Sequence, residues 1–368
     1  MTDHERHLAD LADVARSGLD LVTLWREATP VLAKAVPHFQ SPCFFTVDPS
    51  SMLTTSHFQE GFGEIPTEWL AKEFEAPDFN SLTEVLRSPS GVGTLADATD
   101  GQPERAPKFH EEMQPYGCEQ ELAFALRTTR RESWGAVSLY REQGRPQFTE
   151  ADKAFAGAAG RILADGVRFA LLLAQGTEPD LPDPPGVLLL DEDLRSTSAT
   201  PPAVEWLRDL DGTVERLPAV VAAVAGAAVA REGEASAHVR SARGTWVVVH
   251  GSRLAPSREV AVVLSAADPT HLAPLLMRAH GLTDRERQLV HRVLTGASTT
   301  VIARDLAIAE DTVQQHLSSV FNKTGTRSRG ELVGLLFRHH YEPRVRDNEV
   351  RTTTARPVRN GPMAAPGT

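Results

Sequence analysis

The sequence predicts a multidomain α+β protein in which two mixed α/β regions precede an all-α domain of four helices. Three observations support this fold class. The chain has 368 residues, which exceeds the usual size of one domain. A stretch with four prolines and three acidic residues, 176–186, interrupts the apolar patterning. Strand-type runs occur before residue 268, whereas apolar residues repeat at helical spacing through 282–337.

Composition and patterning also place the boundaries between the predicted parts. We expect a first mixed domain over 1–175, a linker over 176–185, a second mixed domain over 186–268, a connecting segment over 269–280 and a helical domain over 281–341. The last segment, 342–368, is rich in Pro, Arg, Thr and Gly and has few large apolar residues. Such a composition cannot bury enough surface to order itself, so it predicts a disordered tail.

The first mixed region begins with apolar residues at helical spacing between Leu8 and Trp25, which predict an amphipathic helix or helix pair. A short strand is expected over 43–47, and the segments 121–126 and 134–140 flank a polar turn typical of a hairpin. A long helix is expected from about residue 150 to 173. This order resembles a GAF domain, a resemblance that implies a sensory role with a small-molecule ligand as a candidate partner.

The second mixed region also combines predicted strands and helices, in fewer residues than the first. Strands are expected over 186–191 and 196–200, followed by a helix that starts at Pro201-Pro202 and an alanine-rich helix that ends at residue 230. Three more strands are expected over 237–241, 245–250 and 260–265. This order resembles a PAS domain, which again implies a sensory module.

The C-terminal region carries clear helix-start and helix-stop signals. Thr283 and Glu286 form a capping-box pattern, and Ser298 is a suitable N-cap for a second helix through Leu306. After a turn over 307–309, a third helix is expected over 310–324 and ends before Gly325. A second capping-box pattern at 328–331 opens a fourth helix. Two short helices joined by a three-residue turn predict a helix-turn-helix.

The segment 282–337 resembles the DNA-binding domain of the LuxR/NarL family along its whole length. The residues that carry the resemblance are Leu282-Thr283, Arg285-Glu286, Gly296, Ile302-Ala303, Leu306, Thr312-Val313, His316-Leu317, Phe321, Lys323, Arg327-Ser328 and Glu331-Leu332-Val333. The resemblance implies that the third helix enters the major groove of DNA. It also implies that Gln314 and Ser318 occupy positions that touch bases.

The spacing of the third helix separates an apolar face from a polar one. If Val313, Leu317 and Phe321 face inward, the polar residues between them face outward, where Gln can pair with adenine and Ser can bond several base edges. Lys and Arg side chains are available for phosphates, among them Arg329. The predicted DNA-binding residues are Thr299, Thr300, Arg304, Thr312, Gln314, Gln315, Ser318, Ser319, Asn322, Lys323 and Arg327.

The sequence departs from the family pattern at several of these positions. Gln314 and Ser318 stand where the family frequently has Lys. The bases that family members contact through these positions therefore do not predict the bases that this protein contacts. Ala309 replaces a frequent Ser N-cap, which costs about 1 kcal/mol of local stability. Thr299-Thr300 replaces a common Asn-Lys pair and removes one expected phosphate contact.

The charge distribution agrees with DNA contact at the C-terminal end. The net charge of −11 argues against a protein that coats nucleic acid by bulk charge. Residues 1–278 hold 25 Lys and Arg against 40 Asp and Glu, whereas residues 279–341 hold eight against six. The two cysteines, Cys43 and Cys118, suit a reducing cytosol. The most apolar run, 217–230, is shorter than the roughly 20 residues that a bilayer needs, and the N-terminus lacks an export signal. We therefore expect a cytoplasmic protein without membrane contact.

These features predict a sequence-specific DNA-binding transcriptional regulator whose sensory domains modulate a helix-turn-helix. Double-stranded DNA is the expected partner, the protein is expected to act as a homodimer, and RNA polymerase is a further candidate partner. No catalytic set, metal spacing or cofactor motif is recognisable, so no enzyme activity, metal or cofactor is expected. Two alternatives remain open: a sigma-like, polymerase-associated promoter-binding protein, and a GAF-like region that acts on a cyclic nucleotide.

Overall fold

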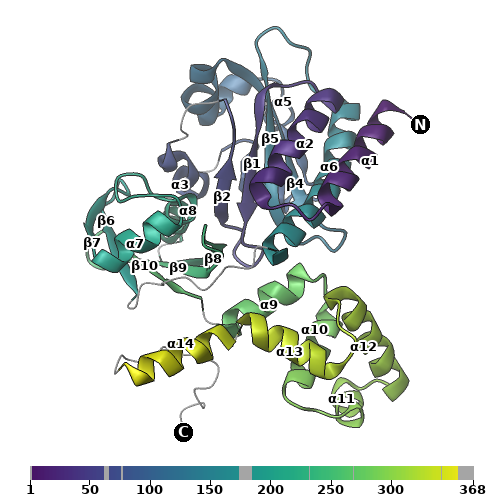
Figure 1. Ribbon diagram of the computed structural model, residues 1–368. Helices are drawn as coiled ribbons and strands as arrows, with labels where there is room; N and C mark the ends of the chain where they lie inside the picture. Colours follow the sequence, from purple (N-terminus) through teal and green to yellow (C-terminus); the bar gives the residue numbers. More distant parts are fainter. Residues whose placement is uncertain are drawn as a thin grey trace. The chain divides into compact units, whose positions relative to one another are not determined.

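The computed structural model describes residues 2–61, 66–75, 78–173, 185–231, 233–267, 269–340 and 342–354. The chain forms two compact units, Met1–Ala266 and Ala267–Thr368, which are described separately (Figure 1). The predicted linker over 176–185 lies outside the described residues except for Pro185. None of the helices in the described ranges is long and apolar enough to span a membrane.

The first region of the N-terminal unit contains a five-stranded antiparallel sheet in the order β2-β1-β5-β4-β3. The predicted hairpin is confirmed, because two neighbouring strands pair through the register Leu122↔Leu139. The predicted strand over 43–47 is also confirmed as the end of a longer strand. The strands are β1 (Phe39–Val47), β2 (Thr54–Phe58), β3 (Val92–Thr94), β4 (Cys118–Arg127) and β5 (Ser133–Glu142).

Helices cover both faces of this sheet. The predicted helix pair and long helix are confirmed as α1 (Asp3–Arg16), α2 (Leu21–Ala35) and α6 (Glu150–Leu173), which lie together beside β4 and β5 in Figure 1. Shorter elements follow β2 and β3: α3 (Thr67–Glu75), α4 (Leu82–Arg87), α5 (Leu95–Ala98), the π-helical turn η2 (Phe109–Met113) and the 3₁₀ turns η1 (Pro103–Arg105) and η3 (Gln114–Tyr116).

Strand β1 divides its side chains between the two faces of the sheet. Phe44 stacks on Trp25 of α2 with ring centroids 4.5 Å apart. Its neighbours Cys43 and Phe45 pack instead with Leu70 of α3. Successive side chains of a strand point to opposite faces, so β1 contributes to the helical layer on one side and to the pocket described below on the other.

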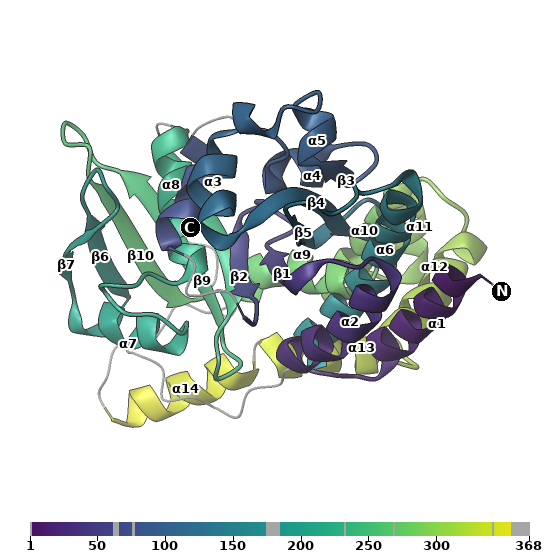
Figure 2. The ribbon, with the colours of Figure 1, turned by 90° about the horizontal axis from the view of Figure 1, so that it is seen from above.

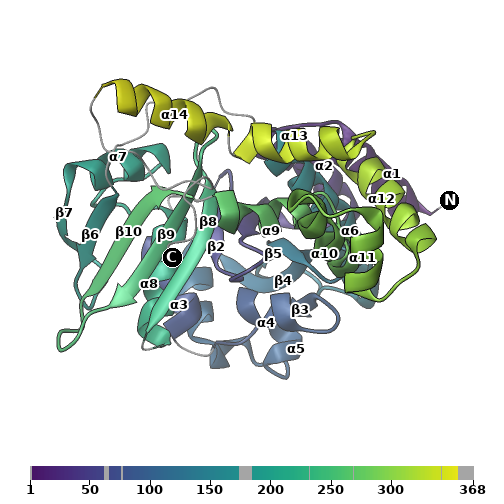
Figure 3. The same ribbon diagram turned by 90° about the horizontal axis from the view of Figure 1, so that it is seen from below.

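The second region has its own five-stranded antiparallel sheet in the order β7-β6-β10-β9-β8, which is visible in Figure 3. The predicted order of two strands, two helices and three strands is confirmed. The strands are β6 (Gly186–Leu190), β7 (Ser196–Ala199), β8 (Glu234–Arg240), β9 (Trp246–Arg253) and β10 (Val260–Ala266). The helices are α7 (Pro201–Asp209) and α8 (Ala219–Ala230).

Helix α8 joins the two regions of the N-terminal unit. It is apolar on all sides, and nearly all of its residues are buried, as expected for a helix with neighbours all around. It packs on its own sheet and against α3 of the first region, beside which it lies in Figures 1 and 2. A second contact pairs Asp48 after β1 with the backbone N–H of His238 in β8, at 2.8 Å.

The described residues of the C-terminal unit form helices joined by short turns. The four predicted helices correspond to α10 (Asp284–Leu294), α11 (Thr299–Leu306), α12 (Glu310–Thr324) and α13 (Arg329–His340). The capping box of Thr283 and Glu286 is confirmed, and Ser298 caps α11. Gly325 ends α12 with a positive φ of 67°. The core holds Leu289, Val290, Ile302, Val313, Leu317, Val320 and Leu332.

Two further helices correct the expectations for the flanking segments. The expected connecting segment over 269–280 contains α9 (Pro269–Ala279), whose Leu272, Leu275 and Leu276 are buried. The expected tail begins with α14 (Glu342–Thr353), and residues 355–368 lie outside the described residues. Disorder was expected from the average composition of the whole segment 342–368. The Pro and Gly residues concentrate after Thr353, whereas the only proline of α14 stands at its second position, where helices tolerate it.

Candidate DNA-binding surface and sensory pocket

The turn between α11 and α12 sets the geometry of the helix-turn-helix. Ala307, which ends α11, has a left-handed backbone with φ of 52°, and this reverses the chain within three residues. Ala309 occupies the N-cap position of α12 without a side-chain capping bond. This confirms the expected departure from a Ser cap. Glu310 and Asp311 in the first turn instead complement the positive end of the helix dipole.

Helix α12 presents one buried and one exposed face. Val313, Leu317 and Val320 are buried, whereas Phe321 is only half-buried at the edge of the core. The exposed face contains Gln314, Gln315, Ser318 and Asn322. The predicted polar face therefore exists as a continuous exposed strip of uncharged hydrogen-bonding side chains.

The start of α11 is held close to the start of α12. The Gln314 Nε2 atom donates to Thr299 Oγ1 at 3.4 Å, and Arg329 donates to the same oxygen at 2.9 Å. Arg329 also donates to the Ala297 carbonyl at 3.0 Å, so this guanidinium has protein partners. The Ser318 hydroxyl donates back to the Gln314 carbonyl at 3.0 Å. Gln314 and Thr299 thus belong to one small polar patch.

The other predicted residues lie around this patch with different exposures. Thr300 and Arg327 are exposed, and Thr312 is half-buried. The Arg304 side chain is 76% exposed, although it pairs with its neighbour Asp305 at 3.2 Å. Of the predicted phosphate-binding cations, Arg304 and Arg327 therefore have the most solvent access.

Glu286 links the first helix of the domain to α12. Its side chain is only 4% exposed and accepts the Lys323 ammonium at 2.7 Å and the Ser319 hydroxyl at 2.6 Å. It also accepts the backbone N–H of Thr283 at 2.6 Å. Burial alone would raise the pKa of Glu286, but these donors lower it to about 2.

Lys323 and Ser319 therefore have structural partners that sequence reasoning did not anticipate. Ser319 is predicted to contact DNA because it falls on the polar side of α12, and Lys323 because it is a cation near the end of that helix. The spacing within one helix shows which residues share a face. It does not show that an acidic residue 37 positions away, Glu286, lies opposite that face.

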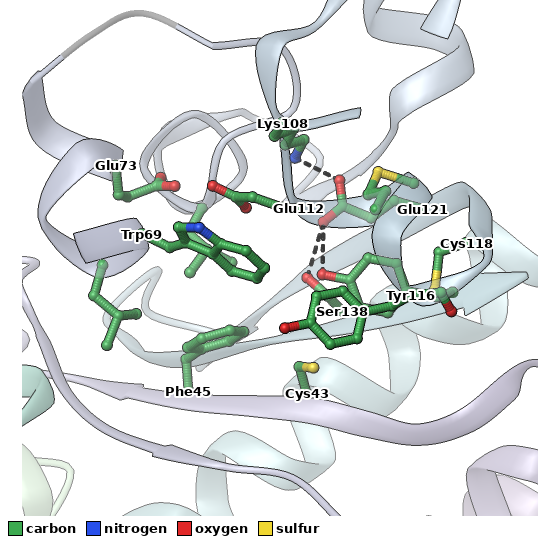
Figure 4. Close-up of a pocket in the computed structure, with 14 residues that line it drawn as sticks. Cys43, Phe45, Trp69, Glu73, Lys108, Glu112, Tyr116, Cys118, Glu121 and Ser138 are labelled. Carbon is green, nitrogen blue, oxygen red and sulfur yellow. Dashed lines mark hydrogen bonds and ion pairs between the residues drawn. The ribbon is translucent and has the colours of Figure 1, made fainter. Parts of the chain in front are cut away.

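The N-terminal unit contains a pocket between the first sheet and the short helices after β2. It encloses about 90 Å³, whereas one water needs roughly 10–15 Å³. Figure 4 shows its aromatic, acidic and thiol side chains around one space. The lining residues are Cys43, Phe45, Trp69, Leu70, Glu73, Leu82, Lys108, Glu112, Met113, Tyr116, Cys118, Glu121, Ser138 and Tyr140. Of these residues the sequence pattern indicates only the two cysteines, because the segment 67–116 has no strong periodicity.

One side of the pocket is a fully bonded ion pair. Lys108 lies 2.5 Å from Glu121, and their side chains are 11% and 5% exposed. The Glu121 carboxylate also accepts Asn80 at 2.9 Å. It accepts Ser138 at 3.2 Å, a bond that Figure 4 draws. Burial alone would lower the pKa of Lys108, but Glu121 raises it above its usual value. The lysine is therefore held charged.

Two further carboxyl groups in the pocket are not paired with a positively charged side chain. Burial raises the pKa of Glu73 to about 7, and it raises the pKa of Glu112 to about 7 as well. Glu73 accepts the Thr83 backbone N–H at 2.8 Å. Glu112 has no hydrogen bond or ion pair among the described residues, although the charge of Lys108 partly offsets the rise of its pKa. Figure 4 shows both carboxyl groups pointing toward each other beside the Trp69 ring.

The two cysteines of the pocket are not poised for thiolate chemistry. Burial raises the pKa of Cys43 far above its usual value, and burial raises the pKa of Cys118 to about 11. The negative charge of Glu121 adds to both shifts. Reactive cysteines need a lowered pKa, so these thiols act here as buried apolar surface.

The C-terminal unit has the architecture of a helix-turn-helix domain, a class that binds DNA. Its residues 280–336 match the family model "Bacterial regulatory proteins, luxR family". This domain is therefore a luxR-family helix-turn-helix domain.

Curated relatives match the same part of the chain. The CsgBAC operon transcriptional regulatory protein of Escherichia coli K12 is 40% identical over 52 residues, which are 14% of this chain and 24% of that protein. The monoamine regulon transcriptional regulator of Klebsiella aerogenes is 48% identical over 52 residues, which are 14% of this chain and 23% of that protein. The match thus spans about a quarter of each relative.

Solved structures show weaker similarity. A Vibrio cholerae VqmA–ligand–DNA complex is 19% identical with a TM-score of 0.20, covering 42% of this chain and 83% of that one. The Escherichia coli DhaR(N)–DhaL complex is 13% identical with a TM-score of 0.19, covering 72% of this chain and 88% of that one. The GAF-like and PAS-like assignments remain predictions, although the N-terminal unit does contain two five-stranded antiparallel sheets.

Proposed function

We propose that the protein is a sequence-specific DNA-binding transcriptional regulator that acts as a homodimer on a two-fold-related site. The observation that carries this proposal is the exposed polar strip of α12 within a luxR-family domain. Such a helix can enter the major groove and bond to base edges. The acidic N-terminal unit repels phosphates and has the role of a sensor.

The proposed interface separates base contacts from backbone contacts. Gln314, Gln315, Ser318 and Asn322 face base edges, whereas Arg304 and Arg327 contact phosphates. The remaining proposed residues support this surface from its edges: Thr299, Thr300, Thr312, Ser319 and Lys323. Among these, Thr299 positions Gln314, and Ser319 and Lys323 anchor α12 through Glu286.

The N-terminal pocket supports the sensory part of the proposal. Trp69, Leu70 and Glu73 line it from α3, and α3 packs against α8 of the second sheet region. Leu70 and Phe45 share an apolar cluster with Ala222 of α8. A ligand that displaces α3 therefore changes the contact with α8. This contact is the physical route by which ligand binding in the pocket affects the second sheet region.

Selection of duplexes from a random library by the full-length protein tests the DNA-binding function. We expect enrichment of a two-fold-related sequence and a stoichiometry of two chains per duplex. A folded protein that enriches no sequence contradicts the proposed function. A single chain on one half-site contradicts the dimer alone.

Gln314→Ala is expected to weaken binding to the selected duplex by about 1–3 kcal/mol and to change binding to random DNA little. Gln314 bonds to Thr299 at the start of α11, which places its amide at the tip of the reading helix. Titrations against both duplexes at several salt concentrations measure the difference. Gln288→Ala is the matched control, because this exposed glutamine lies on α10. Equal losses on both duplexes remove Gln314 from the base-reading surface.

A further inference from the structure

The pocket of the N-terminal unit contains more negative than positive side chains. Three carboxyl groups line it, those of Glu73, Glu112 and Glu121, but Lys108 is the only cationic side chain among the lining residues. Lys108 is committed to Glu121 at 2.5 Å and to the Asn80 carbonyl at 2.8 Å. Lys108 lowers the pKa of Glu73 and of Glu112 only from a distance, so both carboxyl groups face the same space without an ion pair of their own among the described residues.

Aromatic rings form much of the rest of the wall. Phe45, Trp69, Tyr116 and Tyr140 line the pocket, and the Trp69 and Tyr116 rings meet edge to face with centroids 5.8 Å apart. The faces of such rings attract cations, Trp most strongly. The rings and the carboxylates of the pocket thus both favour a positively charged ligand.

The same geometry disfavours an anionic ligand. The ammonium of Lys108 already binds one carboxylate and one carbonyl oxygen inside the protein. An anion would have to approach between Glu73 and Glu112, whose charges repel it. A neutral ligand supplies no counter-charge, so the raised pKa of Glu73 and Glu112 then favours their protonated forms, whereas a cation favours their ionised forms.

We propose that this pocket binds a small organic cation, an amine with an apolar body, whose ammonium group lies between Glu73 and Glu112 and against the ring of Trp69. The proposal rests on the proposed function, because it names the class of ligand that the sensory unit recognises. The apolar body of the ligand would contact Phe45, Leu70 and Met113, which line the same pocket.

The direct test is calorimetric titration of the full-length protein with matched pairs of compounds. Butylamine, 2-phenylethylamine and tryptamine carry the cation, and butanol, 2-phenylethanol and tryptophol replace it by a hydroxyl group. We expect at least one amine to bind about tenfold more tightly than its alcohol, because only the amine compensates the two carboxylates. Alcohols that bind as well as their amines contradict the proposal, as does the absence of binding by every amine up to roughly 10 mM.

The variant Glu112→Gln tests whether amine binding depends on the charge inside the pocket rather than on the general charge of the protein surface. It should weaken amine binding about tenfold and leave alcohol binding unchanged. Glu111→Gln is the matched control, because the neighbouring Glu111 pairs with Lys72 on the exposed side of the same turn. Trp69→Leu provides a second variant that keeps the carboxylates but removes the ring. Unchanged amine affinity in both Glu112→Gln and Trp69→Leu overturns the site.

Binding of the amine should also depend on pH in one direction. A cation favours ionised Glu73 and Glu112, so affinity should rise about tenfold or more between pH 6 and pH 8. The other titratable groups that face these two are Cys43, Asp78, Lys108, Tyr116, Cys118, Glu121 and Tyr140. An affinity that does not change over this range, or falls, contradicts the placement of the ammonium.

The DNA selection described above keeps the two proposals separable. Sequence-specific DNA binding without any amine binding overturns the cationic ligand and leaves the regulator intact. Amine binding by a protein that selects no DNA sequence supports the pocket and overturns the proposed function.

Discussion

Lys323→Met is expected to destabilise the C-terminal helical domain by about 3 kcal/mol, since it leaves the buried carboxylate of Glu286 without its cation. The Glu286 side chain is 4% exposed, and Lys323 lies 2.7 Å from both of its oxygens. Methionine keeps much of the apolar stem of lysine, so the variant removes mainly the charge. The ion pair connects α10 with α12, and its loss should loosen the helix that carries the polar strip.

Hydrogen exchange of the α10 and α12 amides measures this change in the full-length protein. It is the suitable probe because all five tryptophans lie before residue 267 and do not report on this domain. Arg327→Met is the matched control for stability, since Arg327 is an exposed cation close to Lys323 in the sequence. If Lys323→Met leaves exchange unchanged but reduces the salt dependence of DNA binding by about one charge, Lys323 is a phosphate anchor instead.

The same ion pair predicts acid sensitivity of the C-terminal domain. The folded-state pKa of Glu286 is about 2, below its usual value of 4.5. A lowered pKa contributes stability that is present above pH 4.5 and is lost as the pH falls toward 2. In Lys323→Met the protection factors, which are the exchange rates corrected for the intrinsic effect of pH, should therefore change less over this range than in the unaltered protein.

The helices of the C-terminal domain could be predicted because their signals are local. Thr283 and Glu286 are three residues apart, and Ser298 stands directly before the helix that it caps. The same local signals gave the polar face of α12. They could not show that Glu286 serves twice, as a capping residue and as the partner of Lys323, because that second role depends on how α10 and α12 pack.

The pocket could not be predicted for a similar reason. Glu73, Glu112 and Glu121 lie on α3, η2 and β4, and the first two elements are short and weakly periodic. The charge imbalance arises only when tertiary packing places all three carboxyl groups around one lysine. The hairpin of β4 and β5 was predictable, whereas the layer of short helices that covers it was not.

The contact between α3 and α8 is the second feature that only the structure shows, and it depends on Gly226. A Cβ atom at this position would lie 2.6 Å from the Ala71 carbonyl oxygen and 2.8 Å from the Ala71 Cα atom. Both atoms belong to the backbone of α3, so they cannot move away as a flexible side chain can. The missing side chain of Gly226 therefore allows the two helices to approach closely.

Gly226→Ala is expected to destabilise the N-terminal unit by about 2 kcal/mol in thermal or urea unfolding, because overpacking against α3 outweighs the gain in helix propensity. It should also weaken amine binding, since α3 carries Trp69 and Glu73 into the pocket. Gly157→Ala in α6 is the matched control. Its Cβ would meet only a Val92 methyl group at 3.3 Å, so this variant should be as stable as the original protein or more so. If both variants gain stability alike, α8 does not pack closely against α3 in solution. Ligand binding in the pocket then does not affect the second sheet through this contact.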